Sequence, residues 1–244
     1  MVLEWIILAT IIDSLVGLAG IFSLWLSKKN LEKILFALVG FSAGALLSGA
    51  FFHLLAESIE PLGTTIAFAS LFFGFILFFL IERVLHWHHC HEGKCETHPL
   101  TYLILLGDGI HNFIDGLVIA ASFLVGIEFG TITTMAIIAH EVPQELGNFG
   151  VLIYGGFSRV KALAFSFLSQ ATCVAGGLVG FLLAAQTGFS NYLLPFAAGG
   201  FIYIAASDLI PELHKETETK KVIFSFAFFI IGVVFLYIMK VGFE

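Results

Sequence analysis

Long apolar runs follow one another along almost the whole chain, and they constrain its fold more than any other feature. Hydrophobic residues make up 59% of the 244 residues, only 12% are charged, and the mean hydropathy is +1.00. Soluble domains have about 25% charged residues, and a membrane-spanning helix needs about 18 or more apolar ones. We therefore expect an all-α integral membrane protein with eight transmembrane helices. To within a few residues, the predicted spans are 3–26, 33–55, 62–85, 100–124, 130–154, 161–186, 191–210 and 222–240.

Little sequence is left outside these spans, so residues 1–244 are predicted to form a single transmembrane domain. The net charge of −7 without clustered Lys and Arg predicts no nucleic-acid partner. The first run lacks a basic start and is longer than the apolar part of a signal peptide, so we expect it to be retained. Three cysteines do not form a disulfide framework.

Basic residues gather in alternate connections between the spans. Of the eleven Lys and Arg, all except Lys240 lie in the first, third, fifth and seventh connections. The positive-inside rule then places these connections in the cytoplasm and both termini outside. The residues concerned are Lys28, Lys29, Lys33, Arg83, Lys94, Arg159, Lys161, Lys215, Lys220 and Lys221.

The second and seventh spans resemble each other. Residues 41–57 and 196–212 are identical at six of seventeen aligned positions, and the pair His53 and Glu57 aligns with the pair Asp208 and Glu212. Because the two spans run in opposite directions, we expect a 3+2+3 inverted repeat around a central pair of helices. Transporters often place a midplane site at such a repeat interface. The repeat would also put His53 and Glu57 at an outer mouth, and the two acids of the seventh span at an inner one.

The central pair of spans carries polar residues that apolar helices rarely contain. The fourth reads Asp108-Gly-Ile-His111-Asn112-Phe-Ile-Asp115-Gly116, and the fifth reads His140-Glu141-Val-Pro143-Gln144-Glu145-Leu-Gly-Asn148. A charge at membrane depth costs about 3 kcal/mol by insertion scales and is normally kept for a site or a pathway. This mixture of side chains favours a divalent transition metal between helices four and five.

Helical spacing groups these residues, because positions four apart share a face. His111 and Asp115 point the same way, as do His140 and Gln144. Together they form a mixed nitrogen and oxygen set suited to Zn²⁺ and acceptable for Fe²⁺, Mn²⁺ or Cd²⁺. Asn112 and Glu141 are candidates for a second position beside it. No cofactor other than the divalent ion itself, as transported substrate, is expected.

Proline and glycine residues shape the same two helices. Pro143 removes a backbone donor and so frees the carbonyl of Ala139. We expect the glycines to let the two helices approach closely. They are Gly107, Gly109, Gly116 and Gly147.

The two motifs resemble the signature of the ZIP (Zrt-/Irt-like) metal-ion transporters. The fifth span is similar to the branch that reads His-Glu-x-Pro-His-Glu-x-Gly-Asp, and the fourth matches at 111–113 and 115–116. The resemblance implies eight helices, termini outside and a binuclear midplane site. In it, His111, Asp115, His140 and Gln144 would take the first position and Asn112 and Glu141 the second. A homodimer in the lipid bilayer is a further candidate implied by the family.

Three departures from that pattern put the second metal position in doubt. Gln144 replaces a His, and Asn148 replaces an Asp. The sixth span has Gln170, Thr172 and Cys173 where some members place a bridging Glu. A single-metal site is therefore an alternative to a binuclear one.

A His- and Cys-rich segment occupies the third connection, at about 86–99. It contains five His, two Cys and two Glu in the thirteen residues 86–98. The spacing matches no zinc finger, so we expect a flexible cytoplasmic segment that binds metal with modest affinity.

The leading hypothesis is a multi-pass transporter of the cell membrane (plasma or inner) that carries divalent metal, most of all zinc, into the cytoplasm, and not an enzyme. One alternative is an intramembrane zinc metallohydrolase, because His140-Glu141 begins like His-Glu-x-x-His. Against this alternative, the position of the second His in that motif is occupied by Gln144. The other alternative is a metal sensor that does not transport.

Overall fold

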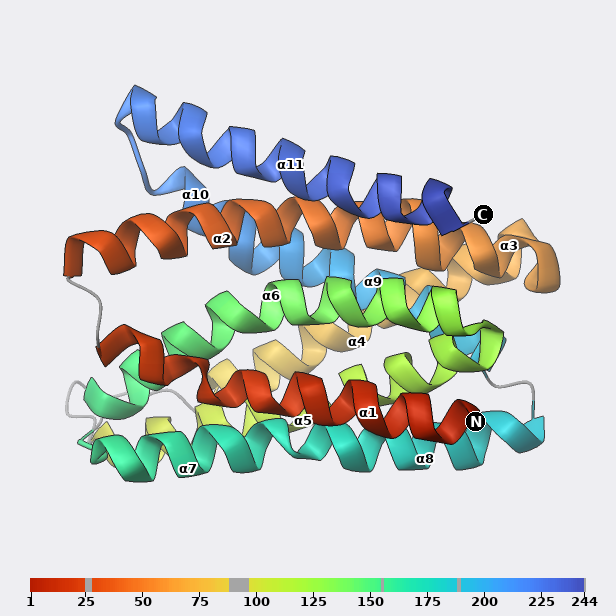
Figure 1. Ribbon diagram of the computed structural model, residues 1–244, viewed down its shortest axis with the longest axis horizontal. Coiled ribbons are helices and arrows are strands. Elements are labelled where there is room, and N and C mark those ends of the chain that lie inside the picture. Colours follow the sequence, from red (N-terminus) through yellow and green to blue (C-terminus); the bar gives the residue numbers. More distant parts are fainter. Residues whose placement is uncertain (25–27, 88–96, 155, 188–189, 244) are drawn as a thin grey trace.

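The computed structural model describes residues 1–24, 28–87, 97–154, 156–187 and 190–243. These residues form a bundle of long helices, and the described part of the chain contains no strand (Figure 1). The elements are α1 (Val2–Ser14), η1 (Leu15–Leu24), α2 (Lys28–Ser48), η2 (Gly49–Leu55), α3 (Ala56–Leu62), α4 (Thr64–Trp87), α5 (Thr97–Val125), α6 (Ile127–Tyr154), α7 (Arg159–Gln170), α8 (Thr172–Thr187), α9 (Ser190–Ile204), η3 (Ala205–Leu209), α10 (Ile210–His214) and α11 (Thr219–Phe243).

Each of the eight predicted spans coincides with a helical stretch of this structure. Four of them are composite, because η1 continues α1, η2 joins α2 to α3, α8 follows α7 after a break at residue 171, and η3 joins α9 to α10. Seven stretches of the described chain are long and apolar enough to cross a membrane. The stretch formed by α6 is 28 residues long but is not among these seven. Its polar stripe, which includes Glu141 and Glu145, lowers its hydropathy.

The predicted metal-binding segment of the third connection lies largely outside the described residues, which leave out 88–96. Helix α4 continues to Trp87 and α5 begins at Thr97. Both helices therefore extend into the range predicted as a connection.

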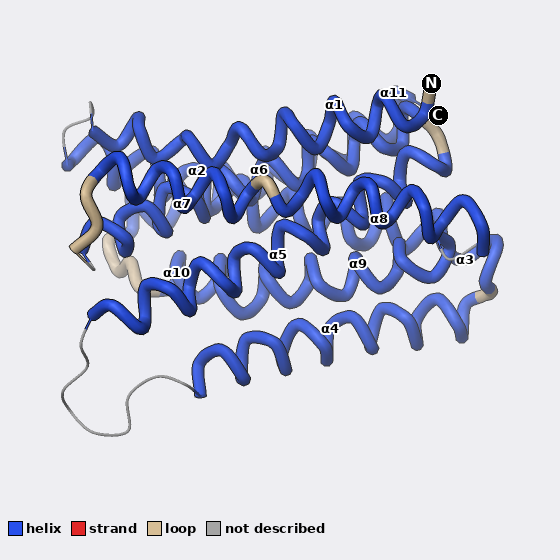
Figure 2. The backbone as a smooth tube through the Cα atoms, turned by 90° about the horizontal axis from the view of Figure 1, so that it is seen from below, coloured by secondary structure: helices blue, strands red, loops and turns tan. Residues whose placement is uncertain are grey.

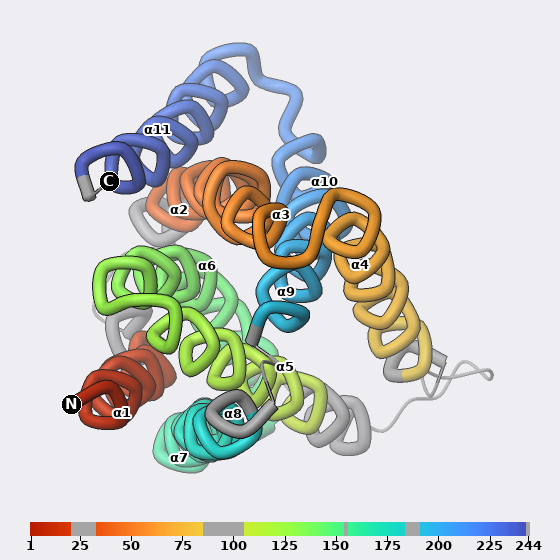
Figure 3. The backbone as a smooth tube through the Cα atoms, turned by 90° about the vertical axis from the view of Figure 1, so that its right-hand side faces the viewer, coloured from red at the N-terminus to blue at the C-terminus, as the bar shows by residue number. Residues whose placement is uncertain are grey.

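Both termini lie at one end of the bundle (Figure 2). The end of α4, the start of α5, the start of α7 and the short helix α10 lie at the opposite end. The helix ends that flank the Lys- and Arg-bearing connections thus gather on the side away from the termini. Figure 3 shows α5, α6 and α9 near the centre of the bundle, with α4 and α11 on its outside.

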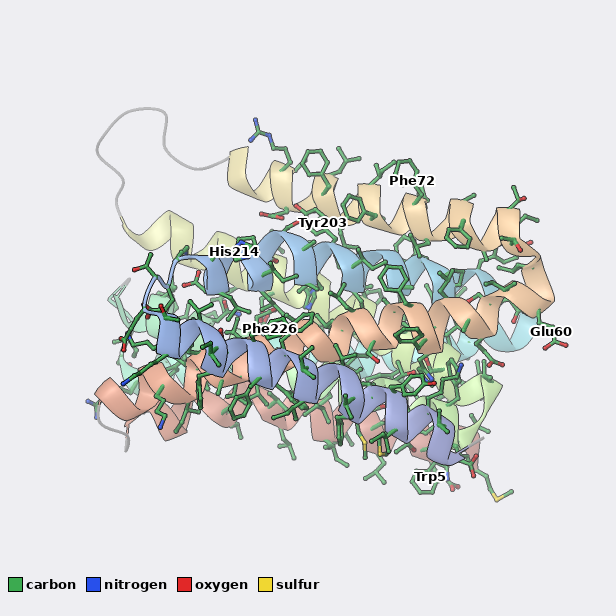
Figure 4. The ribbon with its side chains drawn as sticks, turned by 90° about the horizontal axis from the view of Figure 1, so that it is seen from above. Trp5, Glu60, Phe72, Tyr203, His214 and Phe226 are labelled. Carbon is green, nitrogen blue, oxygen red and sulfur yellow. The ribbon has the colours of Figure 1, made fainter. Side chains whose placement is uncertain are left out.

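Large apolar side chains cover the outer face of the bundle. Figure 4 shows Phe72 on α4 and Phe226 on α11, and these side chains are 63% and 61% exposed. Exposed apolar surface on this scale is unusual for a soluble monomer. In a membrane protein it is the surface that contacts lipid.

Glycine pairs bring three sets of helices into close contact. A Cβ atom added at any of these glycines would lie 2.0 Å from a backbone carbonyl oxygen of the partner helix. The pairs are Gly44 with Gly232 between α2 and α11, Gly74 with Gly199 between α4 and α9, and Gly116 with Gly176 between α5 and α8.

Of the four glycines predicted to bring α5 and α6 close together, Gly109, Gly116 and Gly147 do not do so. Gly109 lies against Ser169 and Thr172, and Gly116 packs against α8. Nothing lies within 4 Å of a Cβ built at Gly147. The polar side chains of the candidate site fill the space between α5 and α6, so the close approach occurs on the other face of α5.

His53 lies in a different environment from the one predicted. Its ring is 3% exposed, stacks on the Phe129 ring at a centroid distance of 3.8 Å, and places Nε2 3.0 Å from Oγ1 of Thr133. His53 therefore packs against α6 and does not line an open mouth.

Candidate metal centre

Two helices supply the side chains of the candidate site. Helix α5 contributes Asp108, His111, Asn112 and Asp115, whose spacing of three and four residues puts them on one side of the helix. Helix α6 contributes a second polar stripe, from His140 to Asn148. Most of these side chains are buried, and those of Asn112, Asp115, His140, Glu141 and Glu145 are at most 1% exposed.

Four of these side chains converge on one point. Nε2 of His111 lies 3.1 Å from Nε2 of His140 and 3.1 Å from Oε1 of Glu141. Nε2 of His140 lies 3.3 Å from the same Glu141 oxygen. Oδ2 of Asp115 lies 3.5 Å and 3.4 Å from the two imidazole nitrogens. We call these four side chains the His cluster.

The separations within the His cluster match the edges of a metal-coordination tetrahedron. Zn²⁺ ligand distances of about 2.0–2.2 Å place tetrahedral ligand atoms about 3.3–3.6 Å apart, and the five separations above range from 3.1 to 3.5 Å. Asp115 Oδ2 and Glu141 Oε1 are buried, and both face the two imidazole nitrogens. A single ion could contact all four residues.

Backbone contacts orient His140 toward this point. Its Nδ1 lies 3.3 Å from the carbonyl oxygen of Ala136, one turn earlier on α6. When Nδ1 carries the proton, Nε2 is left with its lone pair facing the cluster. Metal-ligating histidines commonly use their second nitrogen in this way.

Pro143 affects α6 as predicted. The carbonyl of Ala139, which loses its helical partner at Pro143, accepts a 2.5 Å hydrogen bond from Oγ of Ser42 on α2. The same hydroxyl also lies 2.7 Å from the carbonyl of Leu38. Helix α6 continues through Pro143.

Gln144 lies in a different position from the one expected in the set of four. Its Nε2 donates a 3.2 Å hydrogen bond to Oδ1 of Asp108, and Asn148 donates a 2.8 Å bond to the same oxygen. Glu141 occupies the place expected for Gln144 beside His111 and His140. The reason is electrostatic: the amide N–H is drawn to the Asp108 carboxylate, one turn below the His cluster.

The expected second pair, Asn112 and Glu141, is only partly brought together. Asn112 donates through Nδ2 to the carbonyl of Asp108 (2.9 Å), and its buried Oδ1 has no hydrogen-bond partner. Glu141 is shared between the His cluster and a hydrogen bond from Gln170. Gln170 therefore contacts a carboxylate of the His cluster.

Asp13 is a buried residue that sequence reasoning missed. It is 0% exposed on α1, and the thiol of Cys173 is a hydrogen-bond partner of its carboxyl group. One signal could have found it. Asp13 is the only charged residue between Glu4 and Lys28, in the middle of an apolar run.

A cavity of about 570 Å³ leads from the His cluster to one end of the bundle. Its wall includes His111 and Asp108 near the cluster and Tyr203, Asp208 and Glu212 farther out. Tyr203 donates a hydrogen bond to Glu82 across this wall. The cavity ends on the side of α10, away from both termini.

Charged pairs lie in and just after α10, where Glu212 lines the cavity. Nζ of Lys215 lies 2.5 Å from the Glu212 carboxylate, and Lys221 lies 2.8 Å from Glu216. The Lys221 ammonium holds the pKa of the Glu216 carboxyl below its usual range.

The fold and the site together define a class. The chain is a helical membrane protein with a cavity of about 570 Å³ and a largely buried set of two imidazoles and two carboxylates. Comparison with known proteins narrows that class to a family. The family model described as ZIP Zinc transporter matches residues 2–101 and 88–240, and the chain belongs to the ZIP family.

Named relatives agree with this assignment. The Metal cation symporter ZIP14 of Xenopus tropicalis is 32% identical, over 80% of this chain and 58% of that protein. The Zinc transporter ZIP13 of Pongo abelii is 33% identical, over 84% of this chain and 69% of its own length. The IAA-alanine resistance protein 1 of Arabidopsis thaliana is 43% identical, over 52% of this chain and 28% of its own length. The chain thus spans only part of the relatives it matches.

Proposed function

We propose that this protein transports divalent transition-metal ions, zinc above all, into the cytoplasm through the His cluster. The observation that carries the proposal is the tetrahedral spacing of two imidazole nitrogens and two buried carboxylate oxygens. Two neutral histidines with two carboxylates carry a charge of −2, which one divalent ion balances. The set contains no thiolate, so it can release the ion that it binds.

A proteoliposome uptake assay tests this proposal. Zinc should enter vesicles that contain the purified protein, and His111→Ala and His140→Ala should each abolish uptake while the variants still elute as folded protein. Glu60→Gln, at an exposed carboxylate distant from the cluster, serves as the matched control and should transport normally. Uptake at the wild-type rate in both histidine variants would show that the His cluster is not the transport site.

The same assay separates transport from the alternatives. We propose that the protein is not an enzyme. The metalloprotease motif His-Glu-x-x-His needs a second metal-binding His, and this chain has Gln144 at that position, which donates a hydrogen bond to Asp108. Hydrolysis of peptide or lipid without flux would overturn this. Zinc binding without zinc uptake would instead support the alternative of a metal sensor that does not transport.

We also propose the 3+2+3 inverted repeat, with both termini outside and residues 1–244 as one transmembrane domain. Three features support it. The π-helical segments η2 and η3 fall at aligned positions of the two repeats, and the α2–α11 and α4–α9 glycine pairs are counterparts. In addition, Oγ of Ser14, where α1 ends, donates to the carbonyl of Gln170, where α7 ends (3.0 Å).

Sidedness can be measured directly in intact cells. With Cys90 and Cys95 replaced by serine, Glu4→Cys should react with a membrane-impermeant maleimide, whereas Lys220→Cys should react only after the membrane is opened. The reverse pattern would invert the orientation and the proposed direction of transport.

Membrane and assembly complete the proposal. We place the protein in the cell membrane, and its exposed phenylalanine faces are suitable for a homodimer as well as for lipid.

The 86–99 segment is proposed to collect metal on the cytoplasmic side. Deleting residues 88–98 should change the apparent affinity for zinc but retain transport.

A further inference from the structure

We propose that a groove on the outer surface of the bundle binds one anionic phospholipid, with an acyl chain in the groove and the phosphate beside Arg159 and Lys161. The groove has a volume of about 500 Å³ and lies between α5 and the continuous stretch of α7 and α8. These helices are neighbours at one side of the bundle (Figure 3). We call it the lateral groove. The inference goes beyond the proposed transport function, because its ligand is a lipid and not the metal.

The surface of the lateral groove is apolar. Except for Ser169 and Thr172, its lining residues are Leu, Ile, Phe, Ala and Gly. Oγ of Ser169 lies 3.1 Å from the carbonyl oxygen of Leu105, and Oγ1 of Thr172 lies 2.6 Å from that of Gly109. Both hydroxyls therefore face backbone atoms of α5. The space that remains is suited to hydrocarbon.

The length of the groove matches one leaflet of a bilayer. From Phe165 to Ala175 the chain advances ten residues, which is about 15 Å along a helix. Half of the hydrocarbon core of a bilayer is also about 15 Å. Lys161 precedes Phe165 by four residues, or about 6 Å, which is the depth at which lipid headgroups lie.

Lys161 is held at the head of the groove by aromatic rings. Its Nζ lies 4.0 Å from the centroid of the Phe157 ring and 5.7 Å from that of the Phe165 ring. Phe165 itself lines the groove. Contact with a ring face positions an ammonium group without removing its charge. The positive charge is therefore placed next to the apolar space.

The charge of this region complements a phosphate. Between Glu145 and Asp208, the sequence contains no Asp, Glu, Lys or Arg other than Arg159 and Lys161. Both basic residues are exposed at the start of α7, at the end of the bundle away from the termini. Basic positions beside transmembrane helices on the cytoplasmic side commonly bind anionic headgroups. In the proposed orientation, this end faces the cytoplasm.

The same charges disfavour a second copy of the chain as the occupant. A two-fold symmetric interface pairs each surface patch with itself. A dimer built across the lateral groove would thus bring two pairs of basic side chains toward each other. An anionic lipid instead supplies both the hydrocarbon and the opposite charge.

Native mass spectrometry of the full chain in detergent tests the headgroup. Dioleoyl phosphatidylglycerol and dioleoyl phosphatidylcholine have the same acyl chains and differ in net charge. Each basic side chain near the headgroups contributes about fivefold, so the wild type should bind the anionic lipid about 25-fold more tightly. Arg159→Gln combined with Lys161→Gln should remove this preference. Lys220→Gln combined with Lys221→Gln removes the same charge at the same end of the bundle and should retain it.

A second pair of variants tests the groove. Ala175→Trp places a large side chain in the lateral groove and should weaken the binding of both lipids, whereas Val179→Trp, one turn farther along α8 and outside the lining, should not. Equal affinity of the wild type for the two lipids, or a preference that persists without Arg159 and Lys161, would overturn the proposal. If Ala175→Trp converted a dimer into a monomer and left lipid binding unchanged, a second copy would occupy the groove and the proposal would be wrong.

Discussion

Glu141 determines the composition of the His cluster at the scale of single residues. It follows His140 directly on α6, and its Oε1 reaches both imidazole nitrogens, at 3.1 and 3.3 Å. Gln144 shares a helix face with His140 but donates to Asp108. The cluster thus contains two carboxylates where the spacing of the motif predicts one carboxylate and one amide. The additional charge strengthens the attraction for a divalent cation.

Replacing Glu141 should therefore weaken metal binding more than replacing Gln144. Loss of even an outer partner of a metal ligand typically costs about 10- to 100-fold in affinity, and Glu141→Gln should cost at least this much. Gln144→Ala leaves all four cluster atoms in place and should change affinity by less than about tenfold. Calorimetric titration of the purified variants with zinc measures both. Equal losses would show that Gln144 is a ligand after all.

The sequence predicts all four residues of the His cluster as candidates, but not which side chains contact one another, and it missed Asp13. Helical spacing brings His111 and Asp115 together and gives α6 a polar stripe. It does not decide which of two nearby side chains, Glu141 or Gln144, crosses to α5. That choice depends on where Asp108 lies in space, which no pattern along the chain reveals.

At the scale of helices, glycine pairs set which elements touch. Gly199 of α9 lies against the carbonyl of Leu71 on α4, and its partner Gly74 lies against the carbonyl of Phe196. Close backbone approach of this kind is a common way to join helices in membranes. The sequence indicates that glycines permit such contacts, but it does not tell which face of a helix meets which partner.

Gly199→Ala should destabilise the bundle. The new methyl group would meet the Leu71 carbonyl oxygen at 2.0 Å, so α4 and α9 would have to move apart. Overpacking typically costs about 1–3 kcal/mol, and thermal unfolding in detergent should begin at a lower temperature. Gly150→Ala is the matched control, because nothing lies within 4 Å of its added Cβ. Equal melting temperatures for the two variants would contradict the close contact.

The bond from Ser42 to Ala139 should depend on Pro143. In the wild type, Ser42→Ala removes the hydrogen bond to the freed carbonyl and should lower the free energy of unfolding by about 1 kcal/mol. In a Pro143→Ala background, the new N–H of residue 143 can bond to that carbonyl, so the same change should cost much less. A double-mutant cycle measured by thermal unfolding tests this coupling. Additive effects would show that Ser42 does not compensate for the proline.

At the scale of the whole molecule, the two ends of the bundle differ. The cavity opens at the end that carries Asp208 and Glu212, whereas His53 is packed against Phe129 and Thr133 near the other end. All eight long helical stretches could be predicted from apolar runs, and seven of them are apolar enough to cross a membrane, because a bilayer imposes the length of such runs. The open end could not be predicted, because the apolar pattern does not tell at which end of the bundle side chains pack closed.

Positions 53 and 208 are counterparts in the proposed repeat, so they offer a matched pair for testing this asymmetry. With Cys90, Cys95 and Cys173 replaced by serine, His53→Cys places a thiol where the native ring is 3% exposed, and Asp208→Cys places one at an exposed position on the cavity wall. In detergent, where a maleimide reaches both ends, the thiol at position 208 should react at least about tenfold faster than the thiol at position 53, which corresponds to about 1.4 kcal/mol favouring this state. Mass spectrometry of the labelled protein over time measures both rates. If position 53 reacted as fast as position 208, the closed end would be open for much of the time, and the asymmetry would not describe the dominant state.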